Sequence, residues 1–308
     1  MSAKNEESEA DEMMSRCASC GKPENDDIKL KKCTACYLVR YCSVKCQKKH
    51  WKKHKKECKK RAAELHDELL FKQPERSCYG DCPICCLPLP LDIEKATMMP
   101  CCGKLICIGC DCANQKREVE GRIERKCAFC RHLRPKSVDE AEKILMKRVE
   151  ANDPVALRRV GSLRRDEGDY KGAIKYWTKA AKLGDVLAHY QLAWLYAHGE
   201  GVEKDEKKEV YHLEQAAIGG HLGARYSLSH IEGRNGRYER GIRHVIIAAN
   251  LGHDKSMENV NKLYKKGFVS KDDYDSTLRA QKAAIDAMKS PQREAAAADV
   301  EYSSSRLC

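Results

Sequence analysis

The feature that most constrains this chain is a set of eight cysteine and histidine residues packed into residues 17–58. They form four closely spaced pairs: Cys17 and Cys20, Cys33 and Cys36, Cys42 and Cys46, and His54 and Cys58. Soft ligands at these spacings, in a segment with few large apolar residues, predict a fold held by two tetrahedral zinc ions. Because structural zinc contributes about 10–16 kcal/mol of apparent binding free energy, we expect this segment to unfold without metal.

A disulfide scaffold is the alternative, since seven of the eight residues are cysteines. Two observations favour metal in an intracellular protein. The chain opens with an acidic polar stretch and no apolar signal segment, and its other cysteines again fall into C-x2-C pairs. His54 and Cys58 are four residues apart, so they would face the same way from one helix, with Trp51 on the same stripe.

The run from Tyr41 to Gln47, followed by Trp51, His54, Lys55 and Cys58, resembles the MYND-type zinc finger. The resemblance implies interleaved ligands, with Cys17, Cys20, Cys42 and Cys46 on one zinc ion and Cys33, Cys36, His54 and Cys58 on the other.

That family binds short proline-containing peptides along an extended edge. The matching positions here are Thr34, Gln47 and Trp51. An exposed indole beside a strand edge suits a proline ring, whereas the alternative is that Trp51 only packs its helix onto the zinc loops.

The formal charge of +12 is concentrated in this first segment. Residues 17–61 hold fifteen Lys and Arg against four Asp and Glu. The ten cations within 45–61 suit a solvated helix face, an acidic protein partner or nucleic-acid phosphates. Nucleic acid is the least favoured of the three, because Trp51 is the only aromatic residue among these lysines and no base-reading motif accompanies it.

A second cysteine block follows, and three C-x2-C pairs within fifty residues again predict zinc. Its order resembles a RING-like finger, in which the first and third ligand pairs share one ion. The resemblance assigns Cys82, Cys85, Cys107 and Cys110 to one site, and Cys127 and Cys130 to the other.

The second site of this block departs from the family pattern. Cys102 takes the third ligand place, but Lys104 stands where the family has histidine, and a protonated lysine is a poor zinc ligand. The fourth ligand therefore stays open between Cys101, Cys112 and His132, or the site is incomplete.

RING-like fingers commonly act as ubiquitin ligases by recruiting a conjugating enzyme. Ile84 matches the exposed aliphatic position of such ligases, and Arg131 matches the arginine that touches ubiquitin. An isoleucine between zinc cysteines can also be mere packing, so ligase activity and a purely structural or interaction role are both open.

From Ser137 onward the sequence is repetitive. Asn152, Gly184, Gly220 and Gly252 stand 32, 36 and 32 residues apart, and apolar residues recur at one-face helical offsets after each. These repeats predict helix pairs stacked as a solenoid. They resemble Sel-one-like repeats, relatives of the tetratricopeptide repeat, over about 150–266. Such an array offers an extended surface for peptides or helices.

The sequence thus predicts a multi-domain chain in which two small zinc-stabilised fingers, of mixed α and β structure with little regularity, precede an all-α helical-repeat solenoid. The expected segments are a disordered acidic tail (1–16), the MYND-type finger (17–58), a helical linker (59–77), the RING-like finger (78–136), the repeats with a capping helix (137–289) and a flexible tail (290–308).

The predicted function is a zinc-binding intracellular adaptor, carrying about four zinc ions and binding peptides through the MYND-type finger and the solenoid. The alternative is a RING-type ubiquitin ligase that uses residues 82–131, and nucleic-acid binding through 45–61 is less favoured. No paired carboxylates, Ser-His-Asp order or phosphate loop indicate another enzyme class. No stretch reaches the eighteen apolar residues of a membrane span, and the cytoplasm and the nucleus are both open as locations.

Overall fold

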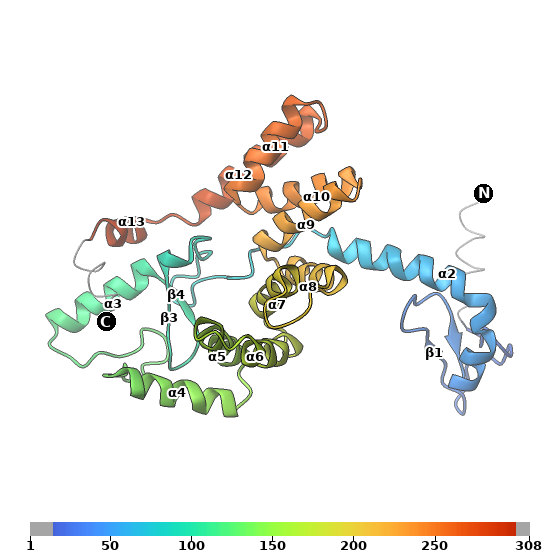
Figure 1. Ribbon diagram of the computed structural model, residues 1–308, viewed down its shortest axis with the longest axis horizontal. Helices are drawn as coiled ribbons and strands as arrows, with labels where there is room; N and C mark the ends of the chain where they lie inside the picture. Colours follow the sequence, from blue (N-terminus) through green and yellow to red (C-terminus); the bar gives the residue numbers. More distant parts are fainter. Residues whose placement is uncertain (1–14, 300–308) are drawn as a thin grey trace. The chain divides into compact units, whose positions relative to one another are not determined.

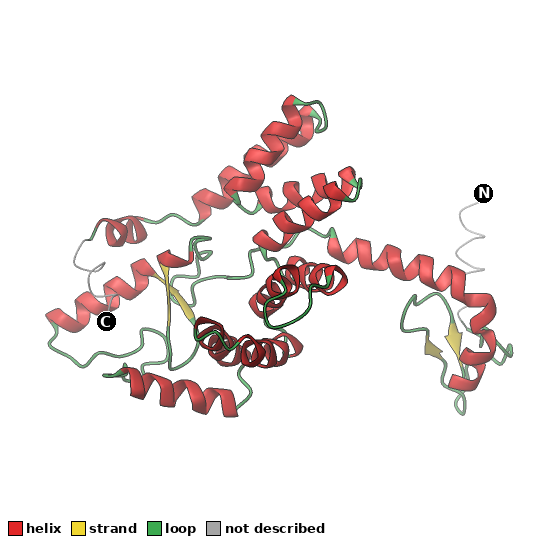
Figure 2. Ribbon diagram, in the orientation of Figure 1, coloured by secondary structure: helices red, strands yellow, loops and turns green. Residues whose placement is uncertain are grey.

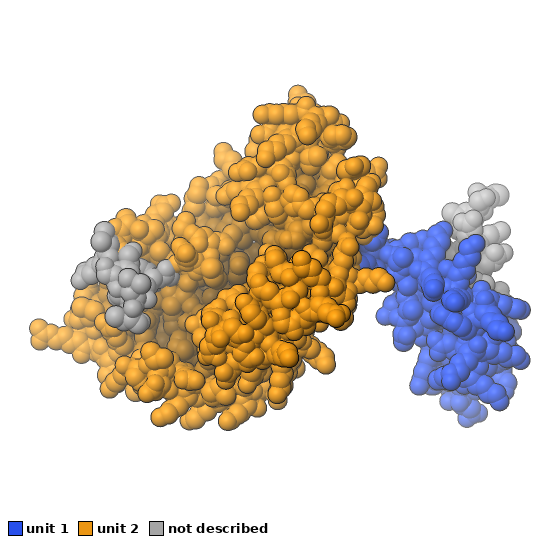
Figure 3. All heavy atoms as spheres, in the orientation of Figure 1, with its two compact units in different colours: residues 1–72 blue, residues 73–308 orange. Residues whose placement is uncertain are grey.

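The computed structural model describes residues 15–299. The chain forms two compact units, residues 1–72 and residues 73–308, which Figure 3 colours separately. The predicted acidic tail, 1–16, lies outside the described residues up to position 14, and so do the last nine residues of the predicted C-terminal tail.

The first unit contains two very short strands and one long helix (Figure 1). Its core consists largely of cysteine side chains. Strand β1 (Lys31–Lys32) pairs antiparallel with β2 (Arg40–Tyr41). The buried cluster consists of Cys17, Leu30, Cys33, Cys36, Tyr41 and Cys58. Because most of these side chains are cysteines, the prediction of a finger with little regular structure and little apolar core is confirmed.

Helix α2 (Val44–Leu70) is the main element of the first unit. The Ser43 hydroxyl accepts a hydrogen bond from the Cys46 amide and so caps the first turn. No glycine or proline interrupts the helix, which therefore runs through the expected boundary between the finger (17–58) and the linker (59–77). The linker is helical only to Leu70, and Phe71 is the C-cap.

The second unit begins with the second cysteine block, which folds around a small hairpin (Figure 2). Strand β3 (Ala96–Met98) pairs antiparallel with β4 (Leu105–Cys107), after a single 3-10 turn, η1 (Ile93–Lys95). Helix α3 (Ile108–Glu120) follows β4 without a break. The buried cluster is Cys82, Leu89, Met99, Ile106, Cys107, Cys110 and Cys127, so sulfur again dominates the interior.

The rest of the second unit is a series of short antiparallel helices. They are α4 (Val138–Glu150), α5 (Pro154–Asp166), α6 (Tyr170–Lys182), α7 (Val186–His198), α8 (Glu206–Ile218), α9 (Leu222–Arg234), α10 (Tyr238–Asn250) and α11 (Asp254–Lys265). Helices α5 and α6, α7 and α8, and α9 and α10 pack as pairs, and each pair packs on the next. The predicted all-α solenoid is confirmed.

The turn residues and small residues of the repeat determine its register. Gly184, Gly220 and Gly252 all have positive φ, between 85° and 94°, a backbone conformation that glycine adopts without strain. Two sets of small residues, all 0% exposed, let neighbouring helices approach closely: Ala156, Ala188, Ala224 and Ser256, and Ala180, Ala216 and Ala248.

The end of the solenoid is covered by α12 (Lys271–Ala287), which packs on α10 and α11. This helix corresponds to the capping helix expected near residues 270–289. It starts at the N-cap Ser270, whose hydroxyl accepts a hydrogen bond from the Asp273 amide.

The expectation of a flexible tail from residue 290 is wrong for its described part. Residues 291–298 form helix α13 (Pro291–Ala298), which packs against α3 of the second cysteine block. Its start carries two local signals, the N-cap Ser290 and a proline at the first helical position. Arg293 and Ala296 are buried in this contact, so the helix is held by tertiary packing as well as by its composition.

Candidate metal centres

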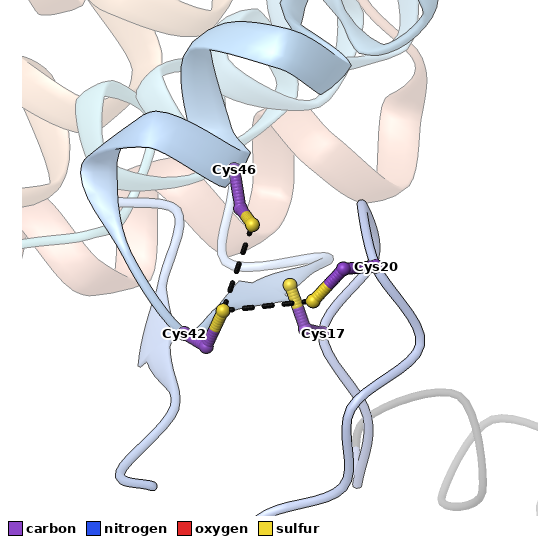
Figure 4. A group of neighbouring side chains, drawn as sticks. All are labelled: Cys17, Cys20, Cys42 and Cys46. Carbon is purple, nitrogen blue, oxygen red and sulfur yellow. Dashed lines mark hydrogen bonds between the residues drawn. The ribbon is translucent and has the colours of Figure 1, made fainter.

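The first centre joins a turn near the chain start to the beginning of α2 (Figure 4). The sulfur atoms of Cys17, Cys20, Cys42 and Cys46 all lie within 4.8 Å of one another. Cys42 Sγ is 3.6 Å from both Cys20 Sγ and Cys46 Sγ. Sulfur atoms bound to one zinc ion at about 2.3 Å stand roughly 3.8 Å apart on a tetrahedron, so this spacing suits zinc.

The second centre of the first unit is fully buried and consists of Cys33, Cys36, His54 and Cys58. Cys36 Sγ lies 3.2 Å from His54 Nε2, and Cys33 Sγ lies 3.8 Å from Cys58 Sγ. His54 and Cys58 are one turn apart on α2, which aims both at the same point. The long helix is therefore part of the centre.

Backbone amides favour the thiolate form in these two centres. Burial by itself raises the pKa of the Cys17 thiol, but hydrogen bonds from the Cys42, Cys20 and Ser19 amides outweigh it and lower that pKa to about 6. The pKa of Cys33 is likewise lowered to about 6, where burial is outweighed by the Ala35 amide and the His54 ring. The thiolate is the form that binds metal, so Cys17 and Cys33 favour zinc near neutral pH. Neighbouring sulfurs raise the pKa of Cys42, and burial raises the pKa values of Cys36 and Cys58, so a metal ion has to displace their protons.

The third centre lies in the second unit and joins the first cysteine pair of the block to the start of α3. It contains Cys82, Cys85, Cys107 and Cys110, and Cys85 Sγ is 3.8 Å from Cys107 Sγ. A hydrogen bond from the Cys107 thiol lowers the pKa of Cys82 to about 4. The Cys82 thiolate carries a negative charge that a bound metal ion would neutralise.

Arg293 of α13 reaches this third centre from outside the cysteine block. Its Nη2 donates to Cys85 Sγ at 3.4 Å, and its Nη1 donates to the carbonyls of Pro88 at 2.7 Å and Met288 at 2.6 Å. Four thiolates around one Zn²⁺ carry a net charge of about −2, which a nearby guanidinium offsets. Arg293 was not among the predicted site residues, because only the Ser290-Pro291 cap signals α13 in the sequence.

The fourth centre contains Cys101, one of the three candidates for the open fourth ligand position. Cys101, Cys102, Cys127 and Cys130 come together, with Cys101 Sγ 3.3 Å from Cys130 Sγ and Cys102 Sγ 3.9 Å from Cys127 Sγ. The other two candidates, Cys112 and His132, lie outside this group. Cys112 is instead buried between Ile108 and Ala296.

All four groups suit zinc, and the described cysteines are free thiols with no disulfide among them. Each group has four protein ligands, the number typical of closed structural zinc sites. The groups combine ligand pairs in the interleaved order that the two family resemblances imply.

The predicted contact residues lie at the surface of their fingers. Thr34 is exposed, and Gln47 is half-buried one helical turn before Trp51, whose side chain is 41% exposed. In the second block, Ile84 is 41% exposed. Arg131 is exposed too, and its Nη1 donates to Asn114 Oδ1 at 3.1 Å.

Comparison with known families identifies two kinds of domain in this chain. The MYND finger model matches residues 17–58, and the Sel1 repeat model matches residues 154–185 and 186–221. Neither covers the second cysteine block, so its RING-like character stays a prediction. MYND fingers and Sel1 repeats are in general protein-interaction modules, and with the cysteine groups they fit a zinc-binding adaptor.

Two solved structures are similar to part of this chain. A Sel1 repeat protein from Oxalobacter formigenes is 28% identical, with 48% of this chain and 66% of that chain covered and a TM-score of 0.41. The protective antigen c5321 of uropathogenic Escherichia coli, which has an SLR fold, is 23% identical, with 53% and 36% covered and a TM-score of 0.39. The chain thus spans less than two thirds of either structure. No curated protein matches.

Within residues 15–299, none of the helices combines the length and the apolar character that a membrane crossing requires.

Proposed function

We propose that this protein is a zinc-dependent adaptor that binds peptide segments of other proteins through its MYND finger and its solenoid. Closed four-ligand centres support a structural role for the metal, because catalytic zinc keeps an open coordination position for water or substrate. The observation that carries the proposal is the exposed indole of Trp51 on a finger whose core is otherwise filled by metal ligands.

The MYND-type surface offers two complementary features for an extended peptide. Gln47 and Trp51 lie on one face of α2, where an amide can bond a peptide backbone and an indole can stack on a proline ring. Thr34 lies in the turn after β1, whose two residues are exposed. The lysines of α2 around this face favour peptides that carry acidic residues beside the proline.

The experiment is a titration of fluorescein-labelled decapeptides, each with two prolines and flanking glutamates, into the full chain. Trp51→Ala removes the stacking platform and is expected to weaken binding by about 2 kcal/mol or more, roughly thirtyfold. Leu69→Ala, which truncates another exposed apolar side chain of α2, is the matched control. Equal binding by Trp51→Ala and wild type, with zinc content unchanged in both, would refute this site.

A second function, ubiquitin ligation through residues 82–131, is supported by the exposure of Ile84 beside the third centre and of Arg131 beside the fourth. An autoubiquitination assay across a panel of conjugating enzymes tests this function. Ile84→Ala should abolish conjugates, while Ile93→Ala, equally exposed in the same block, should leave them unchanged. If no conjugating enzyme yields conjugates, the ligase function is refuted and the adaptor function remains.

Nucleic-acid binding by residues 45–61 has less support, because one exposed aromatic residue among the lysines provides no stacking surface for successive bases. The affinity of such binding would be highest at low ionic strength and would fall steeply with salt. If no nucleic acid binds at low ionic strength, this function is refuted.

A further inference from the structure

A hollow of about 620 Å³ opens between the end of α9, the start of α10 and the end of α11. Its lining includes Gly241, Ile242 and Val245 of α10 and Leu263 of α11. Two large aromatic side chains at its mouth are mostly exposed, Tyr238 at 66% and Phe268 at 62%. Exposed aromatic side chains around an apolar hollow mark a surface that another molecule can cover.

The same chain contains a filled version of this hollow. Helices α5, α6 and α7 correspond to α9, α10 and α11 at a constant offset of 68 residues, and the helix bounds agree to within one residue. Tyr170 and Ile174 of α6 are thus the counterparts of Tyr238 and Ile242. The earlier repeat shows what kind of group this arrangement of helices accommodates.

In the earlier repeat an indole fills the space. Trp177 is fully buried, its Nε1 donates to the Arg158 carbonyl at 3.1 Å, and it lies against Gly161, where an added Cβ would come within 2.4 Å of the ring. The counterparts of Trp177 and Gly161 are Val245 and Ser229. Because Val245 has a small isopropyl group where Trp177 has an indole, the later repeat has a hollow at this position.

A loop also covers the earlier repeat. The turn between α7 and α8 places Gly201 against Tyr170 and packs Val202 on the same apolar cluster. In the later repeat, α12 starts at Lys271, three positions earlier than α8 does in the 68-residue register, so the turn after α11 is shorter. Tyr238 therefore keeps most of its surface in solvent.

The charge around the hollow is positive. Lys262 and Lys266 line it, and no acidic side chain does. The two lysines correspond to Trp194 and His198 of the earlier repeat, so these cations are specific to the open version. Carboxylates on a partner would be attracted to this rim.

We propose that this hollow binds a peptide segment of another protein that inserts one aromatic side chain, Trp or Phe, flanked by acidic residues. The aromatic ring takes the position that Trp177 occupies in the earlier repeat, and the carboxylates pair with Lys262 and Lys266. The inference rests on the proposed adaptor function and deepens it by giving the solenoid one binding site and one class of ligand.

The first test uses a fluorescein-labelled dodecapeptide with one central tryptophan and four flanking glutamates, titrated into the full chain. Lys262→Glu combined with Lys266→Glu should weaken binding tenfold or more. Lys255→Glu combined with Lys265→Glu makes the same change in net charge at exposed positions of α11 outside the hollow, and should change binding less than twofold. If the two double variants weaken binding equally, the peptide responds only to the net charge of the chain, and the proposal is overturned.

The second test fills the hollow with an indole, as Trp177 does in the earlier repeat. Ser229→Gly combined with Val245→Trp transplants the earlier pair and should abolish binding while raising the melting temperature. Gly233→Phe serves if the transplant does not fold, because a Cβ at Gly233 meets nothing within 4 Å and the ring can block the mouth. Undiminished binding by either folded variant overturns the proposal.

The two proposals can fail separately. If the wild-type chain binds the proline peptides but holds the tryptophan peptide more weakly than about 1 mM, this site falls and the adaptor function stands. A concentration-dependent dimer that Gly233→Phe disrupts, without peptide binding, would assign the hollow to a second copy of the chain instead.

Discussion

At the scale of single residues, Arg293 links the C-terminal helix to the third cysteine group. Its side chain is buried, and its donors bond a metal-ligand sulfur and carbonyl oxygens on both sides of the contact. Gly109 permits this approach, because a Cβ there would lie 3.0 Å from the Arg293 amide nitrogen. A buried guanidinium is stable only beside compensating charge, so docking of α13 and the zinc–thiolate centre should depend on each other.

Replacing Arg293 should therefore loosen both the metal and the helix. We expect Arg293→Ala to speed zinc release from one of the four centres severalfold, since a second-sphere hydrogen bond to a ligand is lost, and to remove amide protection from residues 291–298. A chromogenic chelator and hydrogen exchange measure the two effects, and Gln292→Ala, exposed on the same helix, is the control. Unchanged zinc release alongside lost protection would reduce Arg293 to a packing residue.

At the scale of helices, the N-caps of the repeat differ in a way that links stability to pH. Asp153 and Asp185 cap α5 and α7, but at the same place before α9 stands His221, whose Nδ1 accepts a hydrogen bond from the Ala224 amide. Burial lowers the pKa of His221 to about 4. A protonated Nδ1 cannot accept that bond, so the cap exists only in the neutral form.

The solenoid should lose stability below about pH 6.5. The folded-state pKa of His221 lies below the unfolded value near 6.5, so its contribution is complete above pH 6.5 and is lost as the pH falls toward 4. The loss at pH 5 is on the order of 2 kcal/mol. His221→Asn keeps a good cap without a titrating group and should make the fall of the melting temperature between pH 7 and 5 less steep. Part of the fall should remain, because burial also lowers the pKa values of His212 and His244.

The exposed His230 provides the control for this change, because His230→Asn removes a histidine from the same helix without touching the cap. A pH slope that His221→Asn leaves as steep as in the wild type would contradict the assignment.

The sequence predicted best the elements in which a particular residue type is needed for one structural reason. Gly184, Gly220 and Gly252 occur where the backbone needs positive φ, and Ala180 occurs where two helices touch, so the spacing of these residues predicts the solenoid register. The helical continuation past the last zinc ligand was expected, because helix-forming residues continue into the linker (59–77), although the helix ends at Leu70. The existence of α13 was missed, because this helix depends on contacts with α3, far away in the sequence.

At the scale of the whole molecule, ligand grouping was predictable but the fourth ligand and the hollow were not. The C-x2-C pairs combine in the order that the family resemblances imply, whereas Cys101, Cys112 and His132 are equally plausible on spacing alone and only the folded hairpin selects Cys101. The hollow depends on Val245 in place of a tryptophan, together with a shortened turn. Neither change is noticeable until the two repeats are aligned helix by helix.

Removing the metal should divide the chain into parts that unfold and parts that persist. The fingers have cores of cysteine side chains, so a strong chelator is expected to abolish amide protection across residues 17–58 and 82–130. The repeats have an apolar core around Trp177, Leu192 and Leu195, so residues 154–266 should keep theirs. Native mass spectrometry of the untreated chain should count four zinc ions.

A count of three would assign the vacant centre to the Cys101 group, and Cys101→Ser would then leave the count unchanged. A count of zero, with protection of residues 17–58 indifferent to the chelator, would contradict the metal-built fingers.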